Sequence, residues 1–402
     1  MTDGRQLPIL PAKREVTDRQ QQFAFEEGYE TRPPVEARAT TFVGRRVKRL
    51  AQALLRAGFG ALGALLRDWH DPLPPLYPGD ARIRRILVVR VDLLGDTVLS
   101  TPAVRALRRA YPRATIDMLT LASSAAILAG DPDISRVIAF NPHVWRNPAN
   151  WRRLRTWREA LAFLHTARSP RYDLAVSVSG DIGSIVTRLT GARRRVGYAR
   201  EAYRNFLTDP VPGGRYRIHQ HEAQYVLRLA EAAGGIVEPG DEWPRLHVIP
   251  AARERAQVLL HEGRLTTGAQ GPVIALHAGA RNGQAKRWPA RHWSTLIDRL
   301  VSELDALVVL TGAPNEASLA DEITAHALQP ALNLCGRTTL PELTALLSAC
   351  DLVVSGDSGP MHIACAVRTP VVVLHGPTDP AISGPTDPDA IIVRHALWCS
   401  PC

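Results

Sequence analysis

Residues 351–380 read DLVVSGDSGPMHIACAVRTPVVVLHGPTDP. Two apolar, mostly β-branched runs in this segment, 352–354 and 371–374, predict strands. The helix expected between them, which begins near Pro360, is too short to be anything but a crossover between parallel strands. The segment therefore predicts a compact parallel strand–helix–strand unit and an α/β fold.

The loop of this unit has the sequence GDSGP, residues 356–360. Its glycines let the backbone approach a ligand closely, and a proline suits the first position of a helix. Backbone amides at a helix N-terminus favour an anion. The loop is therefore either a phosphate or diphosphate site, with Asp357, Ser358 and His362 around it, or an ordinary turn with a capping Asp.

A second strand–loop–helix unit lies nearer the N-terminus. Residues 86–91 form an apolar run that only Arg90 interrupts, which is typical of a strand buried on both faces of a parallel sheet. A helix is expected over residues 98–110. Gly95 allows a sharp bend between the two, which places Asp96 at the carboxyl end of the strand, where open α/β sheets bind ligands. Asp96 is either a ligand-facing acid or a helix N-cap.

The same alternation of strands and helices continues along the chain. Further strands are expected at 115–120, 137–140, 174–179, 195–198, 246–250, 273–277, 307–310 and 332–334. Two successive α/β series, divided near residue 245, predict two Rossmann-like domains that face each other across a central cleft. We expect domains at 81–245 and 246–402, preceded by an extension, 1–80.

The extension has two parts. Residues 1–40 are polar without a hydrophobic period, so we expect disorder, and no signal peptide is recognisable there. Residues 41–69 have apolar residues at helical spacing and a basic N-terminal half, which predicts an amphipathic helix. This helix lies either in a membrane interface or on the core of the protein. A Pro-rich connector follows.

The net charge of +10 is concentrated in residues 141–217, where fifteen arginines stand against five acidic residues. A basic region in an otherwise balanced protein indicates an acidic partner such as nucleic acid, anionic lipid or a phosphorylated glycan. A preference for Arg over Lys suits bidentate binding of phosphate, although a GC-rich genome produces the same bias.

No metal or cofactor site is predicted. Three of the five cysteines occur in apolar contexts and are expected in the core of a protein from a reducing compartment: Cys335, Cys350 and Cys365. Cys399 and Cys402 form a CxxC without the second ligand pair that zinc requires. The Asp-Pro-Asp motifs at 131–133 and 387–389 have the composition of turns.

Several segments together resemble the ADP-heptose:lipopolysaccharide heptosyltransferases, glycosyltransferase family 9, over roughly residues 84–380. They are ILVVRVDLLGDTVLSTPAVRALRRAYP, YDLAVSVSGD with GARRRVGY, the loop before KRWPARHW, VVLTGAPNE, and SGDSGPMHIACAV with HGPTDP. Their order over this span makes a chance match untenable. The first 80 residues lie outside the resemblance.

The resemblance implies a GT-B architecture with the acceptor on the N-terminal domain and the nucleotide sugar on the C-terminal one. The implied reaction is an inverting, metal-independent transfer of a heptose from ADP-heptose to an inner-core lipopolysaccharide acceptor. It implies a cytoplasmic protein, peripheral at the inner face of the cytoplasmic membrane, whose acceptor is an anionic lipid-linked glycan, with no nucleic-acid partner. Another nucleotide sugar, a protein acceptor, or a degenerate nucleotide-sugar-binding module are the alternatives.

Inverting transfer requires a base for the acceptor hydroxyl and positive charge for the departing diphosphate. Asp96 lies at the appropriate strand end for the base, and by resemblance it matches the catalytic Asp of the family. The donor-site candidates all belong to the C-terminal domain: Lys286, Asp357, Ser358, Gly359 and His362. Lys286 is either a phosphate ligand or a solvated loop lysine. Asp357 contacts the sugar or orders its loop, and His362 contacts a phosphate or packs.

Overall fold

The computed structural model describes residues 58, 73–141, 150, 152–199, 204–214, 220–280, 284–395 and 400–401. Residues 56–402 form one compact unit, and the description below concerns this unit. The predicted tail 1–40, the predicted helix 41–69 apart from residue 58, Cys399 and Cys402 lie outside the described residues. Within the described part of the chain, no helix is both long and apolar enough to cross a bilayer.

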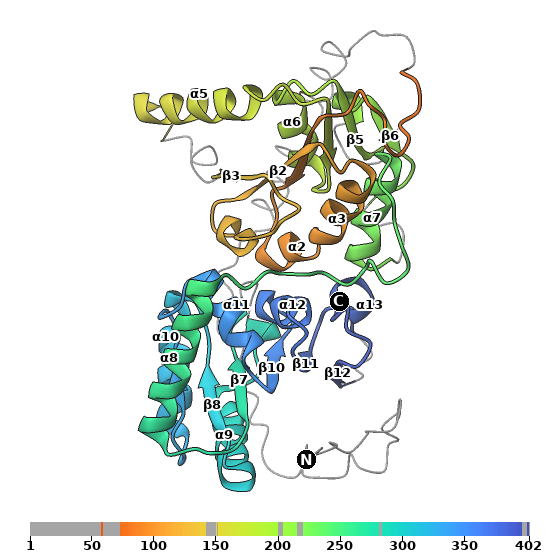
Figure 1. The fold of residues 1–402 in the computed structure, drawn as a ribbon. Coiled ribbons are helices and arrows are strands. Elements are labelled where there is room, and N and C mark those ends of the chain that lie inside the picture. Colours follow the sequence, from red (N-terminus) through yellow and green to blue (C-terminus); the bar gives the residue numbers. More distant parts are fainter. Residues whose placement is uncertain are drawn as a thin grey trace, which may run out of the picture. The chain divides into compact units, whose positions relative to one another are not determined.

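The N-terminal half contains a six-stranded sheet in which every pair of neighbours is parallel (Figure 1). In spatial order its strands are β3 (Arg136–Phe140), β2 (Thr115–Leu121), β1 (Arg85–Arg90), β4 (Leu174–Ser177), β5 (Arg194–Tyr198) and β6 (Asp209–Val211). In the centre, Ile86 of β1 is opposite Ile116 and Leu174. All residues of β1 except the first are buried, as expected for an inner strand.

The helices of this half are α2 (Leu94–Val98), α3 (Thr101–Ala110), α5 (Leu154–Arg168), α6 (Asp181–Leu189) and α7 (Glu222–Ala232), with 3₁₀ turns η2 (Ala125–Leu128) and η4 (Arg204–Phe206). The helix predicted over residues 98–110 is confirmed as α3, which begins at Thr101, whereas the separate short helix α2 before it was not predicted. Pro102 has no N–H with which to continue the hydrogen-bond ladder. The Thr101 hydroxyl donates to the Val98 carbonyl instead, at 2.9 Å.

The C-terminal half contains a second parallel six-stranded sheet. Its strands in spatial order are β12 (Ile391–Arg394), β11 (Val371–His375), β10 (Leu352–Gly356), β7 (Val273–His277), β8 (Leu307–Leu310) and β9 (Leu332–Asn333). Its helices are α8 (Pro250–Thr267), α9 (Ala290–Leu304), α10 (Ala317–His326), α11 (Leu340–Ser348), α12 (Gly359–Ala366) and α13 (Pro380–Ser383), with η5 (Gln284–Lys286) and η6 (Pro314–Glu316). The unit predicted at 351–380 is confirmed as β10, α12 and β11, with Val353 opposite Val371.

The α/β fold class is therefore confirmed, but the strand predicted at 246–250 is wrong. Its residues pair with no strand, and α8 begins at Pro250. Residues 243–246 make hydrogen bonds to helix ends instead of to a strand. Trp243 Nε1 donates to the Cys365 carbonyl at 2.8 Å, Leu246 N to the Ala366 carbonyl at 3.3 Å, and Arg245 N to the Thr101 hydroxyl at 3.2 Å. The connection between the sheets is thus bonded to the end of α12 and to the start of α3.

The core cysteines follow the prediction in two cases of three. Cys350 and Cys365 are buried, whereas Cys335 is partly exposed, and all three are free thiols. Burial raises the pKa of Cys350 to about 12 and that of Cys365 to about 11. These thiols are therefore protonated near neutrality and act as small apolar side chains.

Candidate active site

A buried arginine organises the carboxyl end of β1. The Arg90 side chain is fully buried, and its guanidinium donates to the Val178 carbonyl at 2.6 Å. It lies 2.9 Å from Asp96, 3.1 Å from Asp92 and 2.8 Å from Glu222. A buried cation is stable only when opposite charges and hydrogen bonds replace its hydration. Arg90 therefore fixes the carboxylates at this end of the sheet.

Asp96 is the third residue of α2 and is not its N-cap, which is Leu93. Oδ1 of Asp96 pairs with Arg90, while Oδ2 accepts a hydrogen bond from the Leu93 amide at 3.2 Å. Two different partners thus fix both oxygens, and 23% of the side chain is still exposed. This geometry presents an oriented carboxylate at the carboxyl end of the central strand.

Two glycines allow α2 to pack closely against α12. A Cβ atom on Gly95 would lie 2.6 Å from Cδ2 of His362, and one on Gly359 would lie 2.9 Å from Cδ2 of Leu94. His362 is buried, and its Nδ1 has no hydrogen-bond partner in the described part of the chain. Burial lowers the pKa of His362 to about 4, so the imidazole is neutral near pH 7. The structure thus places His362 in the contact between the two helices.

A cavity of about 660 Å³ lies beside this contact. Its lining includes Leu94, Gly95 and Ser124 from the first half of the unit, and His277, Lys286, Arg287, Glu316, Asp357, Ser358 and Gly359 from the second. Such a volume is typical of small-molecule sites. Four of the predicted donor-site residues meet here. His362 and Asp96 are not part of the lining, although Gly95, the neighbour of Asp96, is.

Lys286 and Asp357 form an ion pair in the cavity wall. Lys286 Nζ donates to Asp357 Oδ2 at 2.6 Å, and the Thr378 hydroxyl donates to the same oxygen at 2.6 Å. Burial alone would raise the pKa of Asp357, but these hydrogen bonds outweigh it and leave the pKa below its ordinary value. An ammonium has three N–H donors and this bond uses one. Lys286 is therefore a positioned cation that can still bind an anion.

The Ser358 hydroxyl is turned away from the start of α12. It lies 3.0 Å from the Ser355 hydroxyl, donates to the Gly356 carbonyl at 3.3 Å, and makes no capping bond to the helix. Gly359 begins α12, and Pro360 occupies its first turn. The first amides of α12 are thus not capped by this side chain, in a loop whose residues line the cavity.

Some residues of this site carried no local signal in the sequence. Glu222 reaches Arg90 from a position 132 residues away, and Thr378 reaches Asp357 from the loop after β11. His277 ends β7 and lines the cavity, with its Nδ1 3.0 Å from the Thr311 carbonyl. Burial lowers the pKa of His277 and favours its neutral form. The charged Arg90 inside an apolar strand was the one visible sign of a buried counter-charge.

The predicted turns at the Asp-Pro-Asp motifs are confirmed. In each motif the second Asp donates its amide to the side chain of the first at 2.9 Å, in residues 131–133 and 387–389. Among the described residues, no group of three or more His, Cys, Asp or Glu side chains has an arrangement that could hold a metal ion. Metal-independent chemistry stays a prediction.

Comparison with known proteins places this site in context. The family model described as "Glycosyltransferase family 9 (heptosyltransferase)" matches residues 160–402. Lipopolysaccharide heptosyltransferase 2 of Escherichia coli K12 is 28% identical over 327 residues, which cover 77% of this chain and 88% of that protein. Lipopolysaccharide heptosyltransferase 1 of the same strain is 25% identical over 317 residues, with 77% of this chain and 93% of that protein covered.

Solved structures agree with the observed fold. The structure of E. coli ADP-heptose lps heptosyltransferase II aligns with a TM-score of 0.64 and 26% identity, over 79% of this chain and 92% of that one. A glycosyl transferase family 9 structure from Veillonella parvula aligns with a TM-score of 0.67 and 22% identity, over 80% of this chain and 88% of that one. The two parallel sheets are therefore those of a GT-B-like glycosyltransferase.

Proposed function

We propose that this chain, which belongs to glycosyltransferase family 9 (heptosyltransferase), transfers a heptose from a nucleotide diphosphate sugar to the inner core of lipopolysaccharide. Membership of the family makes the chain a glycosyltransferase. Its relatives include lipopolysaccharide heptosyltransferases 1, 2 and 3, and their names support the sugar and the acceptor. The observation that carries the proposal is the cavity in which a positioned lysine and the loop of α12 lie beside the helix that bears Asp96.

In the proposed reaction Asp96 is the general base. Its carboxylate takes the proton of the acceptor hydroxyl while that oxygen attacks the anomeric carbon from the side opposite the diphosphate. A new glycosidic bond forms, the bond from the anomeric carbon to the diphosphate oxygen breaks, and the configuration inverts. Arg90 acts as a positioning residue, because its ion pair fixes the orientation of the Asp96 carboxylate.

The leaving group is a diphosphate, so negative charge grows on its oxygen as the bond breaks. Lys286 and the amides at the start of α12 supply the stabilising positive charge, which makes the transfer independent of a metal. Asp357 orients Lys286 and orders the loop. Ser358 and Gly359 bring the backbone of that loop to the donor. His362 contributes by packing against Gly95, so that α2 and α12 stay together.

We further propose ADP-heptose as the donor and an anionic lipid-linked glycan as the acceptor. The arginines of residues 141–217 favour a phosphorylated acceptor. In this proposal residues 81–245 form the acceptor domain and residues 246–402 the nucleotide-sugar domain. The enzyme would then be cytoplasmic and peripheral at the inner face of the cytoplasmic membrane, where such an acceptor is exposed.

The decisive experiment compares Asp96→Asn with Asp92→Asn, because both carboxylates contact Arg90. Asp96→Asn should slow transfer by about 10²–10⁴, the usual effect of losing a general base, with the dissociation constant of ADP-heptose nearly unchanged. Asp92→Asn should keep most of the activity. Transfer is followed by mass spectrometry of a delipidated acceptor. Full activity of Asp96→Asn would refute the base assignment, and equal losses in both variants would assign the effect to the Arg90 cluster.

The same assay separates the alternatives. A screen of nucleotide sugars in which ADP-heptose binds no better than other donors would favour a different sugar. Binding of ADP-heptose without transfer to any lipopolysaccharide or protein acceptor would indicate a degenerate nucleotide-sugar-binding module.

A further inference from the structure

Helix α5 is attached to the N-terminal sheet by one side only. Of its 15 residues, only Thr156 and Ala167 are buried. On the same side, the ring of Phe163 lies 4.8 Å from that of Phe140, at the end of β3. At 100° per residue these three positions fall within a narrow arc of the helix. The opposite arc is therefore turned away from the sheet, and Figure 1 shows α5 projecting from the region of β3 and α6.

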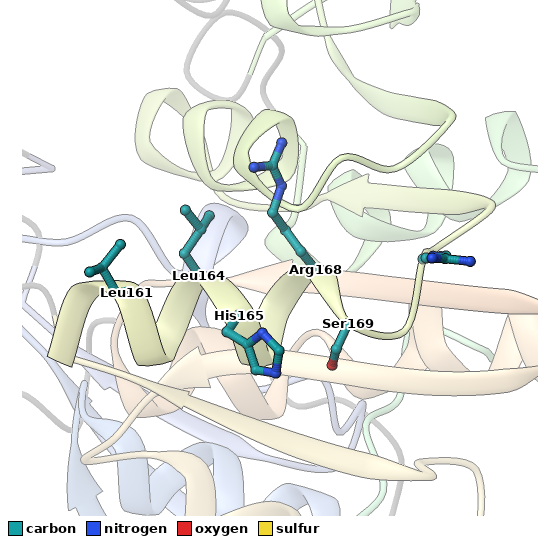
Figure 2. A pocket seen from close by; sticks show the side chains of 6 residues that line it. Leu161, Leu164, His165, Arg168 and Ser169 are labelled. Carbon is teal, nitrogen blue, oxygen red and sulfur yellow. The ribbon is translucent and has the colours of Figure 1, made fainter. Parts of the chain in front are cut away.

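The outward arc carries large apolar side chains. Leu154 is 67% exposed and Leu161 is 65% exposed. Leu164 and Arg168 follow Leu161 at intervals of three and seven residues, and Figure 2 shows the side chains of these three residues on one side of the helix, with His165 on another. Trp157, which is 51% exposed, lies between Leu154 and Leu161 in the sequence and close to them on the helix surface. An exposed apolar stripe of this kind marks an interaction surface.

Helix α5 and the residues that flank it are strongly basic. Between residues 152 and 171 there are six arginines and one acidic residue. The arginines are Arg152, Arg153, Arg155, Arg158, Arg168 and Arg171. The single acid, Glu159, accepts a hydrogen bond from Arg155 at 2.7 Å, so its charge is compensated locally. The surface therefore combines exposed leucines with a nearly uncompensated positive field.

We propose that α5 is a membrane-docking helix that lies in the interface of an anionic phospholipid bilayer. Its leucines enter the boundary between headgroups and acyl chains, and its arginines bind the phosphates. A bilayer fits better than a protein groove because six arginines against one acidic residue on and beside this helix, next to exposed leucines, match a plane of anionic headgroups. The docking surface goes beyond the transfer reaction and needs neither the donor nor the acceptor.

The apolar part is tested on the full chain with Leu154→Ser/Leu161→Ser. The matched control is Leu265→Ser/Leu328→Ser, which changes two leucines that are 73% and 88% exposed elsewhere on the unit. Cosedimentation uses vesicles of phosphatidylethanolamine and phosphatidylglycerol without any sugar donor. We expect the α5 variant to bind at least about tenfold more weakly than the wild type, because partition scales with buried apolar area, and we expect the control to bind as the wild type does.

The electrostatic part is tested with the variant Arg158→Gln/Arg168→Gln. Its control is Arg255→Gln/Arg291→Gln, which changes two exposed arginines on α8 and α9. Only the α5 pair should weaken binding, and that loss should shrink when salt screens the headgroups. Wild-type binding by the α5 leucine variant, or an equal loss in its control, would overturn the proposal. The wild type and all the variants contain residues 1–72. If that segment bound the membrane, the α5 leucine variant would bind vesicles as the wild type does, and this result would contradict the proposal. Transfer to a delipidated acceptor by the α5 leucine variant should be unchanged, which separates this test from that of the enzyme activity.

Discussion

Replacing His362 by Gln should weaken the dependence of the free energy of unfolding on pH below neutrality. His362 is buried against Gly95, and burial lowers its pKa to about 4 from an ordinary value of 6.5. The Asp357 and Asp96 carboxylates favour the charged imidazole but do not outweigh burial. A folded state that binds the proton more weakly than the unfolded chain loses stability as the pH falls. The contribution of His362 is therefore intact above pH 6.5 and is lost between pH 6.5 and pH 4.

The size of this effect follows from the two pKa values. A decrease of the His362 pKa from 6.5 to about 4 corresponds to roughly 3 kcal/mol of unfolding free energy at pH values below both pKa values. Roughly 2 kcal/mol of this is lost between pH 7 and pH 5. Gln has a similar size and does not titrate, so the variant should lack this part of the slope. The other buried histidines are present in both proteins, so the comparison isolates mainly the effect of His362.

The measurement is urea unfolding of wild type and His362→Gln at pH 7 and pH 5. Between these two pH values the variant should lose about 2 kcal/mol less free energy of unfolding than the wild type. His261→Gln, which changes an exposed histidine of α8, should retain the wild-type slope. Equal pH dependence in wild type and His362→Gln would mean that the imidazole is protonated or hydrated in the folded state, and the reasoning from burial would be wrong.

Three further substitutions test the site. Arg90→Met leaves three carboxylates without their shared cation and should lower the free energy of unfolding by about 3–5 kcal/mol, measured in urea; a loss below about 1 kcal/mol would contradict the ion cluster. Lys286→Ala removes a charged donor and should raise the dissociation constant of ADP-heptose roughly 10- to 100-fold by calorimetry while slowing transfer; unchanged values would leave Lys286 as a partner of Asp357 only. Gly95→Ala inserts a methyl group 2.6 Å from the His362 ring and should cost about 1–3 kcal/mol of stability, again in urea, unless α2 can shift freely.

Most strands of the fold could be predicted because each inner strand of a parallel sheet is buried on both faces and appears as an apolar run. The edge strand β12 (Ile391–Arg394) was not predicted, although its sequence IIVR is mostly apolar. It is short, follows a turn-rich segment, and its residues are largely exposed in the structure. Helix α2 was missed for another reason. Its sequence LGDTV is short and contains a glycine, and α12 packs closely against it at Gly95.

The site was predictable where chemistry and chain position coincide. Asp96 at a strand end and the loop of α12 were visible in the sequence, and the structure brings that loop and Lys286 to one cavity. The partners were not visible, because Lys286 and Asp357 are 71 residues apart and Arg90 and Glu222 are 132 apart. Pairings at such distances are decided by the packing of whole sheets.

The hydrogen bonds of residues 243–246 also limit how family members can be recombined. A chimera that exchanges the second sheet alone, with its junction just before α8, would keep the old Trp243 and Leu246 opposite a foreign α12. If the junction lies upstream of Trp243, the two bonds to α12 join residues of one parent again. The bond from the residue 245 amide to residue 101 then joins residues of different parents. A graft of the second sheet in this enzyme therefore has to carry the connecting segment and the first turn of α3 with it.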